Sequence, residues 1–166
     1  MSDAANERST THEIARAEID RWRGRCLDHY ARTERVIGVT LEKAQQSGQI
    51  TKLKGLAGQR FLDLESLIRG ATGTDKQKAA MQVSTERWRT VEARRAYFAH
   101  GVVTALLDQR GNWNARFDLT QYKANAANHE RWTIERSEAL KFEESLKESF
   151  KLVSQQMGLL RKQLAP

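Results

Sequence analysis

The chain has 166 residues, which is enough for one hydrophobic core and too few for two domains of ordinary size. It contains no run of about 18 apolar residues, which excludes a membrane span, and its polar N-terminus lacks a secretory signal, so we expect a cytoplasmic protein. The net charge of +7 favours an acidic partner such as nucleic acid, and the only proline, Pro166, leaves the interior free to form helices.

The first predicted element is a long helix. Thr10 and Glu13 have the spacing of a capping box, so we expect a flexible segment at 1–10 and a helix that begins near Thr11. An apolar stripe then continues to about Gln46. It consists of Ile19, Trp22, Cys26, Tyr30, Ile37, Leu41 and Ala44. The Ser-Gly pair that follows is typical of a helix end, and we interpret the single cysteine on the stripe as a buried core thiol rather than a nucleophile.

Two further helices are predicted in the next part of the chain. The first has apolar residues at helical spacing over 53–68 and ends in the glycine-containing stretch 70–73. Thr74 and Gln77 repeat the capping-box spacing, which predicts a third helix that reaches almost to His100. The stripe of this third helix consists of Met81, Ser84, Trp88, Val91, Arg95 and Phe98.

The period of the sequence then changes. Residues 102–107 are compatible with a strand, residues 108–111 are typical of a turn, and apolar residues alternate with polar ones from Trp113 to Phe117. This pattern predicts a small β-hairpin near 102–118, inserted between helices.

Residues 123–131 are polar and predict no element, but helical spacing returns at about Thr133 and continues to the C-terminus. The stripe of this long final helix consists of Leu140, Leu146, Phe150, Val153, Met157, Leu160 and Leu164. We therefore expect a mainly α fold, with a single domain at 11–166 built as a bundle of about four long helices with the β-hairpin insertion.

The segment 88–101 contains the residues best suited to chemistry. It reads W-R-T-V-E-A-R-R-A-Y-F-A-H-G, and Arg95 falls on the apolar stripe, where a guanidinium group requires a partner or a functional role. His100 follows after four intervening residues and is itself followed by glycine. This pattern resembles the R-x(4–6)-H motif, often R-N-x-x-x-H-G, of the HEPN superfamily of helical bundles. Arg94 fits a longer spacing, whereas the short alignment leaves Ala96 where the family often has asparagine.

The resemblance implies metal-independent RNA cleavage at the interface of a homodimer that brings two motifs together. It also implies a toxin or defence setting, with a partner protein or antitoxin. Arg95 and His100 are then the catalytic residues, because histidine moves a proton near neutral pH and the planar guanidinium group of arginine holds a phosphate. No cofactor or metal is expected, since the spacing of a zinc site is absent among the four histidines His12, His29, His100 and His129.

Other residues are candidates for RNA or nucleotide contact. The basic residues Arg21, Arg23 and Arg25, together with Arg94, are candidates for phosphate binding, and so are Lys52 and Lys54; a solvated helix surface is the alternative interpretation. The tryptophans Trp88, Trp113 and Trp132 could stack on bases, although aromatic residues at these spacings more often fill a core or anchor a hairpin.

Two hypotheses follow from the sequence. The first is a HEPN-like ribonuclease, or an RNA- or nucleotide-binding relative of one. The second is a non-catalytic helical module that binds a partner protein and keeps Arg95 and His100 as scaffold, with the arginine paired to a carboxylate and the histidine capping a helix end. The exposure of the two side chains discriminates between them.

Overall fold

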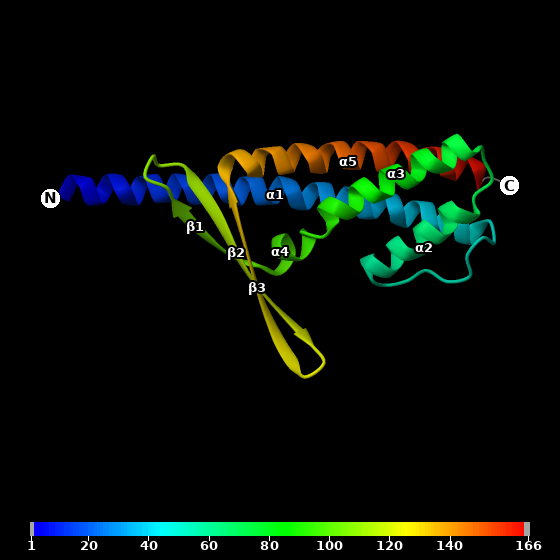
Figure 1. The fold of residues 1–166 in the computed structure, drawn as a ribbon, viewed down its shortest axis with the longest axis horizontal. Helices are drawn as coiled ribbons and strands as arrows, with labels where there is room; N and C mark the ends of the chain where they lie inside the picture. Colours follow the sequence, from blue (N-terminus) through cyan, green and yellow to red (C-terminus); the bar gives the residue numbers. More distant parts are fainter. Residues whose placement is uncertain (1, 165–166) are drawn as a thin grey trace. The chain divides into compact units, whose positions relative to one another are not determined.

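The computed structural model describes the backbone of residues 2–164 and the side chains of residues 10–122 and 124–164. The fold is mainly α-helical with a small antiparallel sheet, as predicted (Figure 1). The chain forms two compact units. One combines the residues up to Asp28 with Ala93–Ser145, and the other combines His29–Glu92 with the residues from Leu146 onward. Within the described range, no helix is both long and apolar enough to cross a membrane.

The first helix, α1, spans Ser2–Gln46 and is longer than predicted. The expected start near Thr11 is wrong, because residues 2–10 include alanine, glutamate and arginine and lack both glycine and proline, so the helix continues through them. All seven residues of the predicted stripe are buried. They include Cys26, and burial raises the pKa of its thiol above the usual range, in agreement with a core role.

The predicted end of α1 is confirmed, and its geometry is that of a Schellman motif. Gly48 has a φ of 75°, and its N–H donates to the Gln45 carbonyl at 3.0 Å. The Gln49 N–H donates to the Ala44 carbonyl at 2.8 Å. These two bonds satisfy carbonyls that have no partner within the helix.

The second unit adds α2 (Ala57–Gly70) and α3 (Asp75–Glu92). The capping box before α3 is confirmed, since the Thr74 N–H donates to Gln77 Oε1 at 3.0 Å and the Gln77 N–H donates to Thr74 Oγ1 at 3.3 Å. The core of this unit contains Trp88, whose ring lies 5.6 Å from that of Tyr30.

The third helix was predicted to reach almost to His100, and this is wrong. Helix α3 ends at Glu92, and a separate short helix, α4, spans Arg95–His100. The Val91 carbonyl, the expected acceptor for the N–H of residue 95 in a continuous helix, accepts the Tyr30 hydroxyl at 2.6 Å. After the break, Phe98 of α4 packs in the aromatic core of the first unit, where it is fully buried.

The sheet of the first unit has the order β1-β2-β3, with β1 at Val102–Leu107, β2 at Trp113–Lys123 and β3 at Ala126–Glu135. The predicted hairpin is the β1–β2 pair, and its turn is held by Asp108, whose carboxylate accepts the N–H groups of Arg110 and Asn112. Strands β2 and β3 continue past β1, so the distal part of their ladder forms a two-stranded arm (Figure 1).

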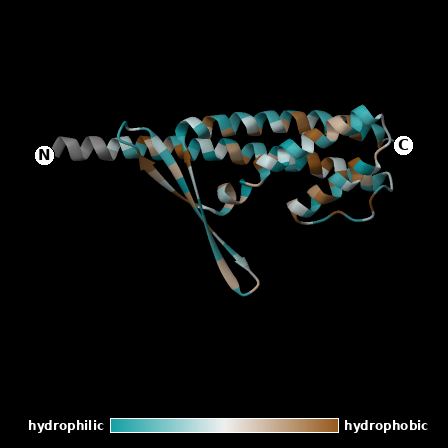
Figure 2. Ribbon diagram, viewed as in Figure 1, coloured by the Kyte–Doolittle hydropathy of each residue, from teal (hydrophilic) through white to brown (hydrophobic). Residues whose placement is uncertain are grey.

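The final helix, α5, spans Arg136–Gln163, and its expected start near Thr133 is wrong because β3 continues to Glu135. Most residues of β3 are exposed, so the strand lacks the apolar alternation that would have indicated it. Leu140 of the predicted stripe is exposed, whereas Ala139 is buried. The remaining residues of that stripe are buried or half-buried. Apolar residues recur between hydrophilic ones along α1 and α5 (Figure 2).

Candidate functional site

The two motif residues lie at opposite ends of α4. Arg95 is its first residue and is half-buried, and His100 is its last residue and is exposed. The five-residue step places the two side chains about 140° apart around a helix of 3.6 residues per turn. They therefore do not stack on one face of α4, and a phosphate held by both would have to reach around the helix.

The backbone of α4 is anchored by two buried aromatic residues. Phe98 packs against Trp22 and Phe117 with ring centroids 5.1 and 5.4 Å apart. The Tyr97 hydroxyl donates to Glu130 Oε2 at 3.0 Å, and burial together with this bond raises the pKa of Tyr97. Tyr97 and Phe98 are thus fixed in the core, while Ala99 and the imidazole of His100 are exposed.

The glycine after His100 is required by close packing. Gly101 is buried, and its N–H donates to the Tyr97 carbonyl at 2.9 Å. A Cβ atom at this position would lie 2.5 Å from that carbonyl oxygen, a distance that no side chain tolerates without movement of the backbone. The glycine of the motif therefore has a structural explanation that does not depend on chemistry.

Arg23 of α1 binds the backbone on both sides of His100. Its Nε and Nη2 atoms lie 2.8 and 2.6 Å from the Phe98 carbonyl oxygen, and Nη2 lies 3.3 Å from that of Gly101. The sequence suggested that a histidine could cap this helix end, but in the structure the cap is an arginine from a distant helix. The guanidinium group of Arg23 is thus occupied by protein atoms.

Two more residues of α1 continue this pattern along β1. Arg16 Nη1 donates to the Val103 carbonyl at 2.7 Å, and His12 Nε2 lies 3.1 Å from the Ala105 carbonyl oxygen. Strand β1 pairs with β2 on its other side, so α1 satisfies carbonyls at its free edge. These contacts were not predicted from the sequence, because they join residues more than 85 positions apart and no local sequence pattern indicates them.

The other predicted phosphate contacts fall in different environments. Arg25 forms an ion pair with Glu143, with Nε 2.6 Å from Oε1, whereas Arg21 is exposed. Arg94 is exposed, and its guanidinium carbon lies 5.1 Å from the centre of the Trp132 ring. Lys52 is exposed.

The tryptophans divide between the core and its edge. Trp88 and Trp113 are buried, as the core interpretation predicts, and Trp113 Nε1 donates to Glu18 Oε2 at 2.8 Å. Trp132 is half-buried and stacks on Phe117 with ring centroids 5.1 Å apart. The ring available for a ligand is therefore that of Trp132, and Arg94 already covers part of it.

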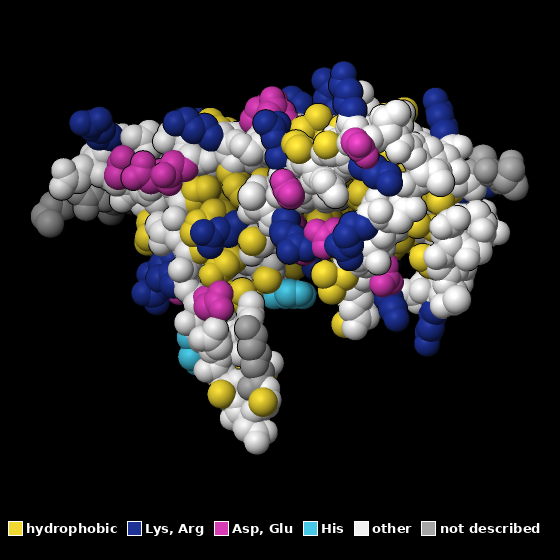
Figure 3. Space-filling model, turned by 45° about the vertical axis from the view of Figure 1, so that its right-hand side comes forward, with side chains coloured by type: hydrophobic (Ala, Val, Ile, Leu, Met, Phe, Trp, Pro, Cys, Tyr) yellow, Lys and Arg dark blue, Asp and Glu magenta, His cyan; other side chains and the backbone are white. Residues whose placement is uncertain are grey.

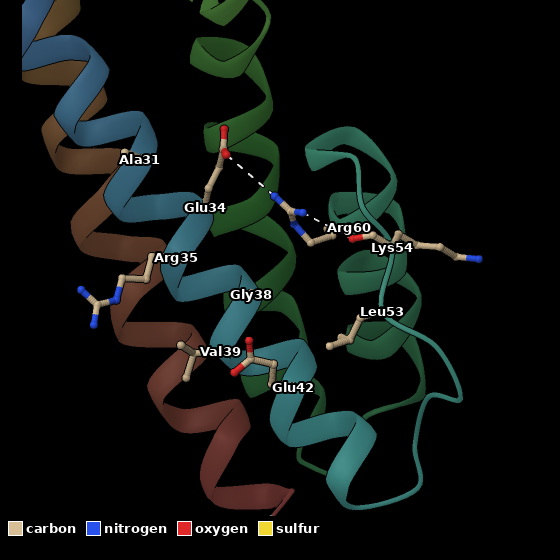
Figure 4. Close-up of a pocket in the computed structure, with 9 residues that line it drawn as sticks. All are labelled: Ala31, Glu34, Arg35, Gly38, Val39, Glu42, Leu53, Lys54 and Arg60. Atoms are coloured by element: carbon tan, nitrogen blue, oxygen red, sulfur yellow. Dashed lines mark hydrogen bonds and ion pairs between the residues drawn. The ribbon is translucent and has the colours of Figure 1, made fainter.

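A cavity of about 560 Å³ lies in the second unit, between α1 and the segment that leads into α2 (Figure 4). Glu34 and Arg60 form an ion pair at its edge, with a separation of 3.9 Å. Lys54 lines the cavity but its side chain points away from it, and so does that of Arg35, whereas Leu53 points toward α1 (Figure 4). Neither motif residue lines this cavity.

The described side chains form neither a single-sign charge patch on the face drawn in Figure 3 nor a cluster of metal ligands. Lys and Arg side chains are scattered and interspersed with acidic ones on the face drawn in Figure 3. Over the described part of the chain, no three His, Cys, Asp or Glu side chains gather as metal ligands would. Comparisons with protein-family models, with curated proteins and with solved structures found no match.

Proposed function

We propose that this protein is a HEPN-like, metal-independent ribonuclease, or an RNA- or nucleotide-binding relative of one, in which Arg95 and His100 act on the substrate. The observation that carries the proposal is the exposure of His100 on a short segment that is held at Phe98 on one side and at Gly101 on the other. Phe98 and Gly101 are buried and held by Arg23, so the imidazole is presented to solvent from a turn with little freedom to move. Such preorganisation is what a general acid or base requires.

The chemistry assigned to each residue follows from its side chain. His100 would take the proton of an RNA 2′-hydroxyl or give one to the leaving 5′-oxygen, because an imidazole can both accept and donate a proton. Arg95 would hold the phosphate whose negative charge grows in the transition state. The products would be a 2′,3′-cyclic phosphate and a free 5′-hydroxyl.

A homodimer is part of the proposal. The separation of about 140° between Arg95 and His100 on one helix means that a second copy could supply the opposing group across a two-fold axis. The bundle of about four long helices and the cytoplasmic location, which the sequence pattern predicts, belong to the same proposal. So does a partner protein or antitoxin, which the family resemblance implies.

A cleavage assay with purified protein and single-stranded RNA in the presence of EDTA tests this function. We expect cleavage by the wild-type protein to survive chelation, and we expect His100→Ala and Arg95→Ala to abolish it. Arg87→Ala is the matched control, because Arg87 is an exposed arginine on α3, outside the motif. The melting temperature of each variant must stay close to that of the wild type for its loss of activity to count.

The structure also gives a specific reason to keep the alternative, a non-catalytic helical module that binds a partner protein. Gly101 is explained by its contact with the Tyr97 carbonyl, and the end of α4 is capped by Arg23, so part of the motif serves as scaffold. If the wild-type protein leaves RNA intact and His100→Ala mainly lowers the melting temperature, the helical binding module is the better description.

A further inference from the structure

The sheet of the first unit has one buried face and one exposed face. Phe117 and Leu119 of β2 are buried, whereas the side chains next to them in the strand point the other way. On that outward face the relative exposure of Val102 is 70% and that of Tyr122 is 84%. A large aromatic side chain with this exposure contributes little to packing and is available to a ligand.

Two arginines share one carboxylate on the outward face. Arg131 Nε lies 2.7 Å from Asp118 Oδ1, and Arg116 Nε lies 3.1 Å from Asp118 Oδ2. The cluster therefore has one uncompensated positive charge. The hydrogen bond from Arg131 lowers the pKa of Asp118, so the carboxylate stays ionised at neutral pH. The side chain of Arg131 is 67% exposed, which leaves N–H donors facing solvent.

The register of the sheet places this cluster beside the motif. Asp118 pairs with Val102 on one side and with Arg131 on the other. Val102 is the first residue of β1 and follows His100 after a single glycine. From Asp118 the arm continues for four residues to Tyr122, or roughly 13 Å at the rise of a β-strand. A positively charged cluster and an exposed aromatic ring thus lie along one strand that begins next to the motif histidine.

We propose that this outward face is the docking surface for single-stranded RNA, with Arg131 on a phosphate and Tyr122 stacked on an unpaired base. The inference rests on the proposed function. Proteins that bind single strands combine positive charge along the backbone with aromatic rings on which bases stack, and this surface has both. Asp118 competes with the phosphate for Arg131, so it limits affinity.

Fluorescence anisotropy with a labelled single-stranded RNA oligonucleotide tests the surface, in a His100→Ala background that prevents cleavage. Arg131→Ala should weaken binding several-fold and reduce the slope of log K against log salt by about one. Tyr122→Ala should weaken binding by roughly 5- to 150-fold, the range for loss of one stacked base. Asp118→Asn should tighten binding, because it removes the competing charge and keeps the shape. Arg87→Ala is the control and should change nothing.

The opposite signs expected for Arg131→Ala and Asp118→Asn separate the proposal from damage to the fold, since either change breaks the same ion pair. If both variants shift the affinity in the same direction, or neither shifts it, the docking surface is wrong. If the wild-type protein cleaves RNA while these variants bind normally, the function stands and only the surface fails. If the wild-type protein neither binds nor cleaves RNA, both proposals fall.

Discussion

Each of the two compact units has its own set of internal contacts. In the first unit, Trp22 donates to the Ala139 carbonyl at 2.9 Å, and its ring lies 5.1 Å from that of Phe98. Aromatic packing and side chain–backbone hydrogen bonds there join segments far apart in the sequence. In the second unit, the Tyr30 hydroxyl also donates to a carbonyl distant in the sequence, that of Val91, and helical stripes, a capping box and the packing of Trp88 against Tyr30 are among its other contacts. Substitutions of polar groups should therefore be felt most in the first unit, which also contains the motif.

The largest expected effect is that of removing the central tryptophan of either unit. Trp22→Ala and Trp88→Ala should each lower the free energy of unfolding by about 3 to 5 kcal/mol, because both rings are almost fully buried. Trp22→Ala should cost about 1 kcal/mol more, since it also leaves the Ala139 carbonyl without its donor. Urea unfolding measures both values. A larger cost for Trp88→Ala would contradict the comparison, and a change under about 0.5 kcal/mol would show that the ring is not packed.

A pair of glycine substitutions tests the close approach at the motif. Gly101→Ala should lower the free energy of unfolding by about 3 kcal/mol, because the new Cβ would meet the Tyr97 carbonyl oxygen at 2.5 Å. Gly24→Ala is the matched control within α1, where a Cβ meets nothing within 4 Å, and it should stabilise by about 0.5 to 1 kcal/mol. Thermal melts followed by circular dichroism give both signs. Equal effects at the two positions would remove the structural explanation for the glycine.

The helices were predictable from the sequence where one face is buried, because a buried face requires apolar residues at helical spacing whatever packs against it. The stripe of α1 is visible because every turn repeats the same requirement, and Gly48 marks its end through a positive φ that favours glycine. Strand β3 was not predictable, because its backbone pairs with β2 while most of its side chains remain in solvent. The break before α4 was missed because no local pattern marks it, and the carbonyl next to it is bonded to the Tyr30 hydroxyl, which is 61 residues away.

The candidate site shows the same limit. The spacing of Arg95 and His100 was visible in the sequence, but the spacing alone could not show that one side chain is half-buried and the other exposed. Arg23 was predicted as a phosphate ligand from its charge. Its contacts with Phe98 and Gly101 arise from the packing of α1 on α4, which only the folded chain defines.

Two arginines of α1 sharpen the comparison further. Arg23→Ala should lower the free energy of unfolding by about 2 kcal/mol, the usual value for charge-assisted hydrogen bonds to partly buried carbonyls. Arg25→Ala should cost less than about 1 kcal/mol, because its ion pair with Glu143 is half-exposed and screened by salt. Urea unfolding at low and high salt separates them, since only the Arg25 effect should shrink as salt is added. Similar costs and similar salt dependence would mean that Arg23 does not hold the end of α4.

A small effect is also expected in the second unit. Thr74→Ala should lower the free energy of unfolding by about 1 kcal/mol, because it removes the side-chain acceptor for the Gln77 N–H at the start of α3. Thr74→Ser keeps the hydroxyl and should be nearly neutral, which makes it the matched control. The same pair of variants should leave RNA cleavage unchanged if Arg95 and His100 carry it, since the cap lies in the other unit from the motif. A loss of cleavage in Thr74→Ala with little change in stability would show that the second unit takes part in the reaction. The assignment of the reaction to the first unit alone would then be wrong.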